Sequence, residues 1–286
     1  MSIPSLASVY ARAGLSIFKS ATLPAGSVSP LSLSCSVPEI DRAKSEAFSR
    51  MVGSRGVPKN FIPSTYLQAH TMAMPMSLLA DLPIRIIGSL HEATEIQCNR
   101  YCEFGEKLKA TASFDGDIRF SDKEDVMLEV KLDIFGEADA GDKPIQTVVN
   151  QYRILNPRRH LIQTEKKEKP SSENDFPDWT TENYHFPIDI GRRYALLNGD
   201  INPIHITSVS AKFFGYKSCI SHGMFSVCKM FGQVEDTGTN YVKGKFVRPI
   251  LLPQDVVGRR DAEGNYVVGY VDKGDFKVCV EGEMRC

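Results

Sequence analysis

The same order of predicted elements occurs twice along this chain, on either side of a charged segment. In each half an apolar helical stretch precedes three strand-like stretches, which are separated by turns that contain Asp, Gly or Pro. The predicted strands are Leu108–Phe120, Val126–Phe135 and Ile145–Leu155 in the first half, and Asp255–Asp261, Tyr266–Val271 and Phe276–Glu281 in the second. This duplication predicts two halves of one architecture, each a helix followed by a run of strands.

The segment between the halves reads EKKEKPSSENDFPDW over residues 165–179. It is charged, contains Pro and Ser and lacks apolar periodicity, which is typical of a linker or a long surface loop. A chain of 286 residues with 42% hydrophobic content can bury two ordinary cores. We therefore predict a leader or docking helix over 1–27, an N-terminal domain over 28–160, a linker over 161–179 and a C-terminal domain over 180–286.

Net charge, apolar runs and cysteine spacing exclude several classes of protein. The formal net charge of −1 gives no general attraction to nucleic acid or to anionic membranes. No apolar run approaches the ~18 residues that a membrane-spanning helix needs. The seven cysteines form an odd set without the paired spacing of a metal site, so that free thiols in a reducing compartment are expected.

One motif in the second half places an acid and an imidazole five residues apart, in the segment Gly199–His205, which reads GDINPIH. Asn202 is a predicted helix N-cap and Pro203 the first helical residue. His205 then falls in the first turn with Asp200 just outside it, so that the two side chains can converge on one point. This spacing favours an enzyme, although the same residues also form an ordinary cap beside a surface histidine.

A second predicted helix start follows at Ser221-His222-Gly223-Met224. We expect Ser221 to be the N-cap and Gly223 the second helical residue. The N–H of Gly223 would have no intrahelical acceptor, would lie at the positive end of the helix dipole and would be open to close approach. It could donate to a developing oxyanion. Alternatively Ser221 takes up this N–H as an ordinary cap, which leaves Gly223 a packing role.

Together these residues resemble the MaoC-like hydratase 2 family, the (R)-specific enoyl-thioester hydratases and dehydratases. The resemblance is closest to the two-domain (3R)-hydroxyacyl-thioester dehydratases, and it is strong in the second half and weak in the first. It implies an α+β double hotdog, two tandem domains that each wrap an antiparallel sheet around a long helix. The residues that carry it are Tyr194, Gly199, Asp200, Asn202, Pro203, His205, Ala211, Gly215, His222, Gly223 and Met224.

The resemblance implies reversible syn hydration of a trans-2-enoyl thioester to a (3R)-hydroxyacyl thioester in fatty-acid metabolism. Asp200 and His205 would hold and polarise the water, Asn202 and Ser221 would support them, and the N–H of Gly223 would bind the thioester oxygen. Acyl-CoA or an acyl-carrier protein is the expected partner, no cofactor or metal is expected, and a homodimer is left open. The alternatives are a hotdog acyl-CoA thioesterase and a non-enzymatic acyl-thioester-binding protein.

An alignment of the two halves by eye predicts a single active site. The first half then lacks the acid, the imidazole and the amide donor, because proline has no N–H. We expect it to be non-catalytic and to make room for the acyl chain. The methionine-rich stretch 71–79 is a candidate lining of that space, although these methionines serve equally well as helix core. The alignment pairs Ser54 with Asp200, Asn60 with His205, and Pro75 with Gly223.

The N-terminal segment leaves the compartment open. Residues 1–38 contain no acidic residue, carry Arg12 and Lys19 and are rich in serine, which is typical of a mitochondrial transit peptide. The stretch Ser5–Lys19 is equally compatible with a helix that docks on the folded domain, the interpretation that we prefer. We therefore expect a cytoplasmic protein, or a mitochondrial one if this segment is a transit peptide.

Overall fold

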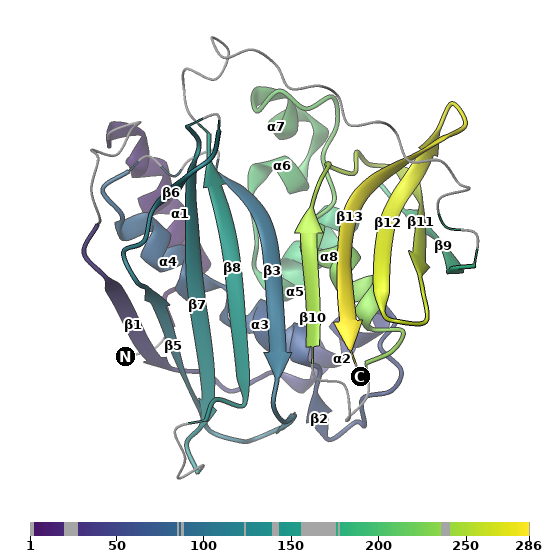
Figure 1. The fold of residues 1–286 in the computed structure, drawn as a ribbon. Helices are drawn as coiled ribbons and strands as arrows, with labels where there is room; N and C mark the ends of the chain where they lie inside the picture. The colour runs from purple at the N-terminus through teal and green to yellow at the C-terminus, as the bar shows by residue number, and fades with distance from the viewer. Residues whose placement is uncertain are drawn as a thin grey trace.

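Both halves of the chain contribute strands to one antiparallel sheet of 11 strands (Figure 1). This computed structural model describes residues 3–19, 28–84, 86, 89–122, 124–138, 143–155, 176, 178–235 and 241–285. The strands run in the order β1-β5-β7-β8-β3-β10-β13-β12-β11-β9, and β6 pairs with β7. The first half contributes β1 (Leu31–Ser36), β3 (Leu90–Cys98), β5 (Leu108–Phe114), β6 (Arg119–Phe120), β7 (Val126–Gly136) and β8 (Gln146–Ile154). The second contributes β9 (Thr180–Phe186), β10 (Tyr241–Phe246), β11 (Gln254–Arg260), β12 (Asn265–Asp272) and β13 (Asp275–Arg285).

The helices lie against one face of this sheet (Figure 1). The first half contains α1 (Leu6–Leu15), a short 3-10 helix η1 (Ser16–Phe18), α2 (Arg42–Val52), α3 (Ser64–Thr71) and α4 (Ala73–Asp81). The second contains α5 (Ile190–Asn198), α6 (Pro203–Ile206), α7 (Ser208–Phe213) and α8 (Gly223–Phe231). A separate two-stranded ribbon pairs β2 (Phe61–Ile62) with β4 (Cys102–Glu103).

The two halves join where β3 pairs with β10 in the middle of the sheet, with Thr94 opposite Gly244. Burial alternates along β7 and β8, so that every second side chain faces the helices and the others face solvent. A Cβ on Gly244 would meet the Val227 side chain at 2.5 Å, so the missing side chain lets α8 approach β10 closely. The expected double hotdog, with helices enclosed by an antiparallel sheet, is thereby confirmed.

The predicted strands are found, with one difference. The stretch 108–120 divides into β5 and β6, because the chain turns at Gly116, whose φ is +92° and whose backbone lies against Val28. The linker predicted over 161–179 lies mostly outside the described residues, which resume with 176 and 178 before β9.

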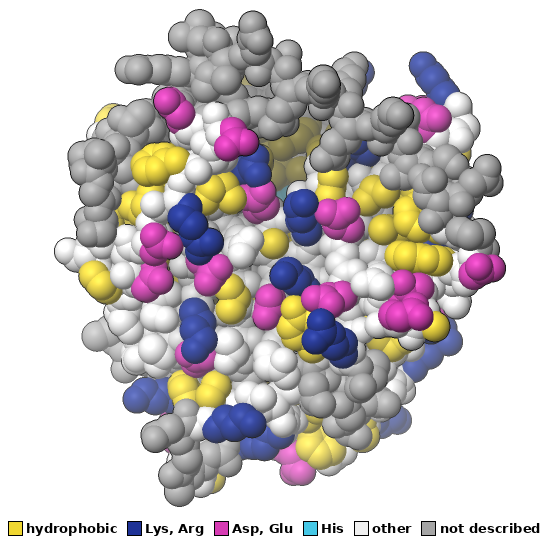
Figure 2. All heavy atoms as spheres, in the orientation of Figure 1, with side chains coloured by type: hydrophobic (Ala, Val, Ile, Leu, Met, Phe, Trp, Pro, Cys, Tyr) yellow, Lys and Arg dark blue, Asp and Glu magenta, His cyan; other side chains and the backbone are white. Residues whose placement is uncertain are grey.

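On its outer face the sheet carries charges of both signs. Figure 2 shows Lys and Arg side chains interleaved with Asp and Glu on this face. Nζ of Lys245 lies 3.2 Å from Oε1 of Glu281. Nζ of Lys243 on β10 lies 3.8 Å from Oε2 of Glu95 on β3, and this ion pair connects the two halves of the sheet. Exposed pairs of this kind contribute little to stability, about 0–1 kcal/mol each.

The N-terminal segment packs on the first half. Val9 of α1 is fully buried, and Arg12 forms an ion pair with Asp81 at the end of α4 (2.7 Å). The ammonium group of Lys19 donates to the carbonyl oxygens of Ala80 and Leu82, where the helix leaves its last carbonyls without partners. Residues 3–19 thus lie docked on the folded domain.

The two halves match in one place where the alignment by eye set them together and differ in another. Gly53 ends α2 with a φ of 82°, as Gly199 ends α5 with a φ of 78°, so Ser54 follows its helix as Asp200 does. The predicted pairing of Pro75 with Gly223 is wrong, because Pro75 lies inside α4. The helix whose start corresponds to that of α8 is α3. It directly follows the short pairing of β2 with β4, as α8 directly follows the bridge at Ile220.

A carboxylate from the second half occupies the start of α3. Oε1 of the buried Glu235 accepts from the N–H and the hydroxyl of Ser64, at 2.8 and 2.7 Å, and from the hydroxyl of Tyr101 at 3.2 Å. Burial raises the pKa of Glu235 above its ordinary 4.5, against these hydrogen bonds. The N–H of Ser64, the first residue of α3, is therefore taken up by Glu235.

We expect Glu235→Ala to lower the free energy of unfolding by about 3 kcal/mol, because it leaves three buried donors without an acceptor and opens a cavity. Urea denaturation would measure the change. Glu46→Ala is the matched control, since Glu46 on α2 is half exposed and pairs only loosely with Arg50 (3.8 Å). A loss in Glu235→Ala no larger than that in the control would contradict the role of Glu235 as an internal cap.

Candidate active site

Asp200 is positioned by the turn that follows α5. Because Gly199 adopts a left-handed conformation, the chain reverses directly after the helix. The Asp200 N–H then donates to Oδ1 of Asn198 (2.9 Å), and Oδ1 of Asp200 accepts from the N–H of Asn202 (3.1 Å). The hydroxyl of Tyr10 also donates to this Oδ1. The carboxylate is therefore held by a neighbour in the chain, Asn202, and by Tyr10 near the N-terminus.

His205 is positioned by α6, as the sequence predicted. Asn202 is the N-cap and accepts from the N–H of Ile204 (3.3 Å), and Pro203 is the first helical residue. Nδ1 of the buried His205 ring lies 2.9 Å from the carbonyl oxygen of Ile220. A carbonyl only accepts, so Nδ1 carries the proton and Nε2 keeps its lone pair.

The start of α8 lies one residue later than predicted. His222 is the N-cap and Gly223 the first helical residue, so the prediction that Ser221 caps this helix is wrong. The reason is a pairing outside the helix: the Ser221 N–H donates to the carbonyl of Ile250 (2.9 Å), which continues the bridge between Ile220 and Leu251. The Ser221 hydroxyl instead donates to the carbonyl of His222 (3.4 Å).

Gly223 keeps its N–H free within the described part of the chain. The first-turn N–H has no acceptor in the helix, and none of the described residues outside it accepts this hydrogen bond. A Cβ on Gly223 would lie 2.4 Å from the Phe246 ring, so only glycine fits beneath this ring. The helix start therefore presents an open amide at its positive end.

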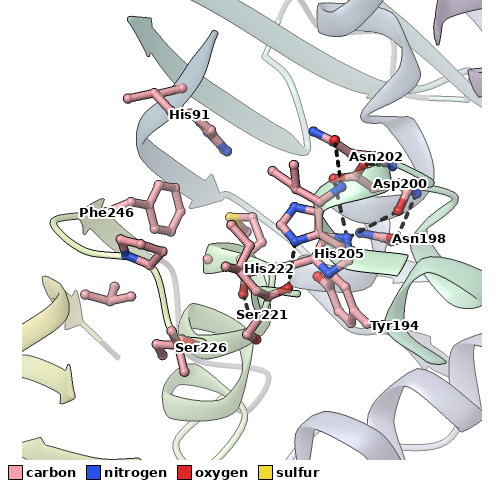
Figure 3. A pocket seen from close by; sticks show the side chains of 18 of the residues that line it. His91, Tyr194, Asn198, Asp200, Asn202, His205, Ser221, His222, Ser226 and Phe246 are labelled. Atoms are coloured by element: carbon pink, nitrogen blue, oxygen red, sulfur yellow. Dashed lines mark hydrogen bonds and ion pairs between the residues drawn. The ribbon is translucent and has the colours of Figure 1, made fainter. Parts of the chain in front are cut away.

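His222 joins the site, although sequence reasoning gave it no role. Its ring stacks on that of His205, with centroids 3.7 Å apart and planes at 25°. Its Nε2 lies 3.2 Å from the carbonyl oxygen of Asp200 and 3.6 Å from Oδ2 of the same residue. Figure 3 shows the two rings beside Asp200. Apart from its place among the residues that carry the resemblance, no signal in the sequence pointed to His222.

The site holds one negative charge at neutral pH. Burial alone would raise the pKa of the Asp200 carboxyl, but the neighbouring His222 and His205 favour the anion. Hydrogen bonds from Tyr10 and Asn202 favour it further, so the pKa of Asp200 lies below its usual 3.8. Burial lowers the pKa of His205 below 6.5, although the negative charge of Asp200 acts to raise it. Burial and the neighbouring His205 lower the pKa of His222 to about 3. The carboxylate is ionised and both imidazoles are neutral.

These groups line a cavity of about 310 Å³ between the two halves. All five residues predicted for the site line it, namely Asp200, Asn202, His205, Ser221 and Gly223. Met72, Pro75 and Met76 line it from the first half, whereas Met74 is fully buried in the core. Within the methionine-rich stretch, Met72 and Met76 therefore face the cavity, whereas Met74 belongs to the core.

His91 and its polar partners form part of the wall opposite the acid–imidazole pair. Nε2 of His91 lies 3.1 Å from Oδ1 of Asn150, to which Thr94 also donates (3.1 Å). The His91 ring stacks on Tyr152 at 5.0 Å, and burial lowers its pKa to about 4. Figure 3 shows His91 and Phe246 on the side of the pocket away from Asp200. His91 is neutral and held in place by its partners.

The trio Asp200, His205 and His222 is also the one group of such side chains, among the described residues, close enough to share a cation, with ligand atoms within 4.8 Å of one another. The two imidazole rings of this trio lie face to face, with centroids 3.7 Å apart.

The fold and site define a double-hotdog protein with an acid–imidazole pair in a cavity. The MaoC like domain matches residues 164–281, which confirms the expected resemblance for the second half of the chain. The chain is 28% identical to 3-hydroxyacyl-thioester dehydratase X of Mycobacterium tuberculosis over 230 residues, which cover 79% of this chain and 78% of the relative.

Solved structures show the same fold. The crystal structure of HtdX from Mycobacterium tuberculosis superposes with a TM-score of 0.69 at 20% identity, covering 89% of this chain and 99% of that one. A MaoC-like dehydratase from Phytophthora capsici gives a TM-score of 0.65 at 16% identity, covering 90% and 95%. A conserved hypothetical protein of Mycobacterium tuberculosis described as a double hotdog gives 0.57 at 9% identity, covering 90% and 96%.

No membrane-crossing helix is found in the part of the chain that the structure describes, since its helices are too short or too polar for that purpose.

Proposed function

We propose that this protein catalyses the reversible hydration of a trans-2-enoyl thioester to a (3R)-hydroxyacyl thioester, carried by CoA or an acyl-carrier protein. One observation carries the proposal: an ionised carboxylate, a neutral imidazole and a free helix N-terminal amide line the same cavity. The similarity to a 3-hydroxyacyl-thioester dehydratase supports it.

The chemistry follows from the hydrogen-bonding capacity of these groups. Oδ1 of Asp200 is taken by Tyr10 and Asn202, which leaves Oδ2 to accept from a water. Nε2 of His205 offers a second acceptor, because Nδ1 is held by a backbone carbonyl. A water bound to both has its protons engaged and its oxygen lone pair directed at the substrate.

Addition of this water forms a bond from its oxygen to C3 and breaks one of its O–H bonds. Electrons of the double bond move to the thioester oxygen, where the Gly223 N–H stabilises the enolate charge. The proton that the acid–imidazole pair has taken from the water is then delivered to C2. Because one pair of groups handles both the oxygen and the proton, both add to the same face of the substrate. Dehydration reverses these steps.

Crotonyl-CoA tests the proposal. We expect the absorbance of the conjugated double bond to disappear without release of free CoA thiol, and the product to be (3R)-hydroxybutyryl-CoA by chiral chromatography. An (S) product would contradict the assignment. Thiol release without hydration would indicate a thioesterase, and bound thioester without turnover a binding protein.

The pH dependence of hydration follows from the lowered pKa values. The working state needs Asp200 ionised and His205 neutral, and the pKa of each lies below its ordinary value. On acidification kcat/KM should therefore stay constant through pH 6.5, where an unperturbed histidine protonates, and fall only at lower pH. Rates measured across this range in buffers of constant ionic strength would show this. A decline centred at or above pH 6.5 would contradict a buried neutral imidazole.

A further inference from the structure

The active site includes a side chain from the far end of the chain. Tyr10 on α1 donates its hydroxyl to Oδ1 of Asp200, across 190 positions of sequence. Tyr10 lines the same cavity as Asp200 and His205. The sequence predicts a leader or docking helix in this segment, and no part in the chemistry.

The two carboxylate oxygens of Asp200 have separate surroundings. Oδ1 accepts from Tyr10 and from the Asn202 N–H, whereas Oδ2 faces Nε2 of His222 at 3.6 Å. Two donors on one oxygen fix the rotation of the carboxyl group, and the other oxygen is left for a water. The amide of Asn202 is a neighbour in the chain, so Tyr10 is the donor that comes from outside this loop.

The position of Tyr10 depends on how α1 is anchored. Arg12, two residues further along the helix, is tied to α4 by its ion pair with Asp81 and by a hydrogen bond to Ser77. Lys19 is tied to the end of the same helix, and Ser16 accepts from the N–H of Ile86 (3.1 Å). These contacts hold α1 independently of the tyrosine. Loss of the Tyr10 hydroxyl should leave the helix in place.

We propose that Tyr10 is a positioning residue for Asp200, and that α1 is a working part of the active site rather than a removable leader. The kinetic part of this inference rests on the proposed hydratase function. Burial and the adjacent carboxylate raise the pKa of the Tyr10 hydroxyl, so it stays protonated and donates. A chain cleaved beyond Tyr10 would lack this donor, which argues against cleavage of the acid-free segment 1–38 as a transit peptide.

Other groups near Asp200 must be considered in any titration. They are His205 on α6, His222 before α8, Tyr194 on α5, Tyr152 on β8 and His91 on β3. Only Tyr10 and the Asn202 amide donate to Oδ1 among the described residues. Removal of the Tyr10 hydroxyl therefore takes one donor from the charged form and should raise the pKa of Asp200.

Tyr10→Phe in the full chain tests the inference. We expect kcat for hydration of crotonyl-CoA to fall about ten-fold with little change in KM, as is typical for loss of a hydrogen bond to a charged group. Tyr241→Phe is the matched control, because the Tyr241 hydroxyl also donates to a carboxylate, that of Glu283 (3.4 Å), outside the cavity. The control should keep the wild-type kcat.

Carbon-13 NMR titration of the Asp200 carboxyl, assigned with Asp200→Asn, gives a second result that does not need turnover. The midpoint should move to higher pH in Tyr10→Phe and stay unchanged in Tyr241→Phe. If the wild-type protein hydrates no enoyl-CoA, the proposed function fails, and the titration still decides the role of Tyr10. An unchanged midpoint would overturn the inference, and a lower melting temperature alongside it would assign Tyr10 to the anchoring of α1.

Discussion

Asp200→Asn is expected to lower the rate of enoyl-CoA hydration about 10³-fold while the protein stays folded. The amide can still accept from Tyr10 and Asn202 through its oxygen, so the loop around it keeps its hydrogen bonds. Its nitrogen takes the place of Oδ2 and cannot accept a proton from water. The substitution therefore removes one of the two proposed acceptors for the water and leaves the shape of the site.

His205→Gln should lower the rate about as much, because in the proposed mechanism Nε2 is the second acceptor for the same water. If the two residues act on one water, the double variant will be little slower than the slower single variant. The measurement is turnover of crotonyl-CoA, with circular dichroism to establish the fold.

The matched control is an acid–imidazole pair outside the cavity. Nδ1 of His185 on β9 lies 2.7 Å from Oδ1 of Asp255 on β11, and both side chains are exposed. His185→Gln and Asp255→Asn should each retain the wild-type rate. Near-normal turnover in Asp200→Asn or His205→Gln would show that the assignment of these two residues is wrong.

The parts of this site that were predictable from sequence are those that depend on neighbours in the chain. Asn202 caps α6 through its own side chain and Pro203 fits the first helical position, so the helix start was placed correctly. Ser221 was misplaced by one residue because a partner far along the chain, the carbonyl of Ile250, decides where the strand pairing stops and α8 begins. A local pattern carries no information about that partner.

The contributions of distant segments were not predictable at all. Tyr10 reaches Asp200 only because α1 folds back onto α4, and His222 stacks on His205 only because two helix starts meet. The alignment failed at Pro75 for the same kind of reason. The start of α3 follows the pairing of β2 with β4, and no pattern of similar residues in the two halves predicts this pairing.

Gly223 can matter for two reasons, its N–H donor and the space that its missing side chain leaves for the Phe246 ring. One comparison of variants separates them. A Cβ at this position collides with the Phe246 ring, so Gly223→Ala alone would confuse the loss of a donor with displacement of the helix start. In a Phe246→Ala background the space is open. Gly223→Ala then keeps the N–H, and Gly223→Pro removes it.

Proline is well suited to this test. The first helical position tolerates it, and His222, which precedes it, already has the extended conformation that a residue before proline needs, with φ −63° and ψ 132°. We expect Gly223→Pro to lower kcat/KM for crotonyl-CoA by about 10²–10³-fold relative to Gly223→Ala, both in the Phe246→Ala background, which is the usual effect of losing one oxyanion donor. Equal rates in the two variants would mean that the charge on the thioester oxygen is stabilised elsewhere, and that the glycine serves only to admit the Phe246 ring.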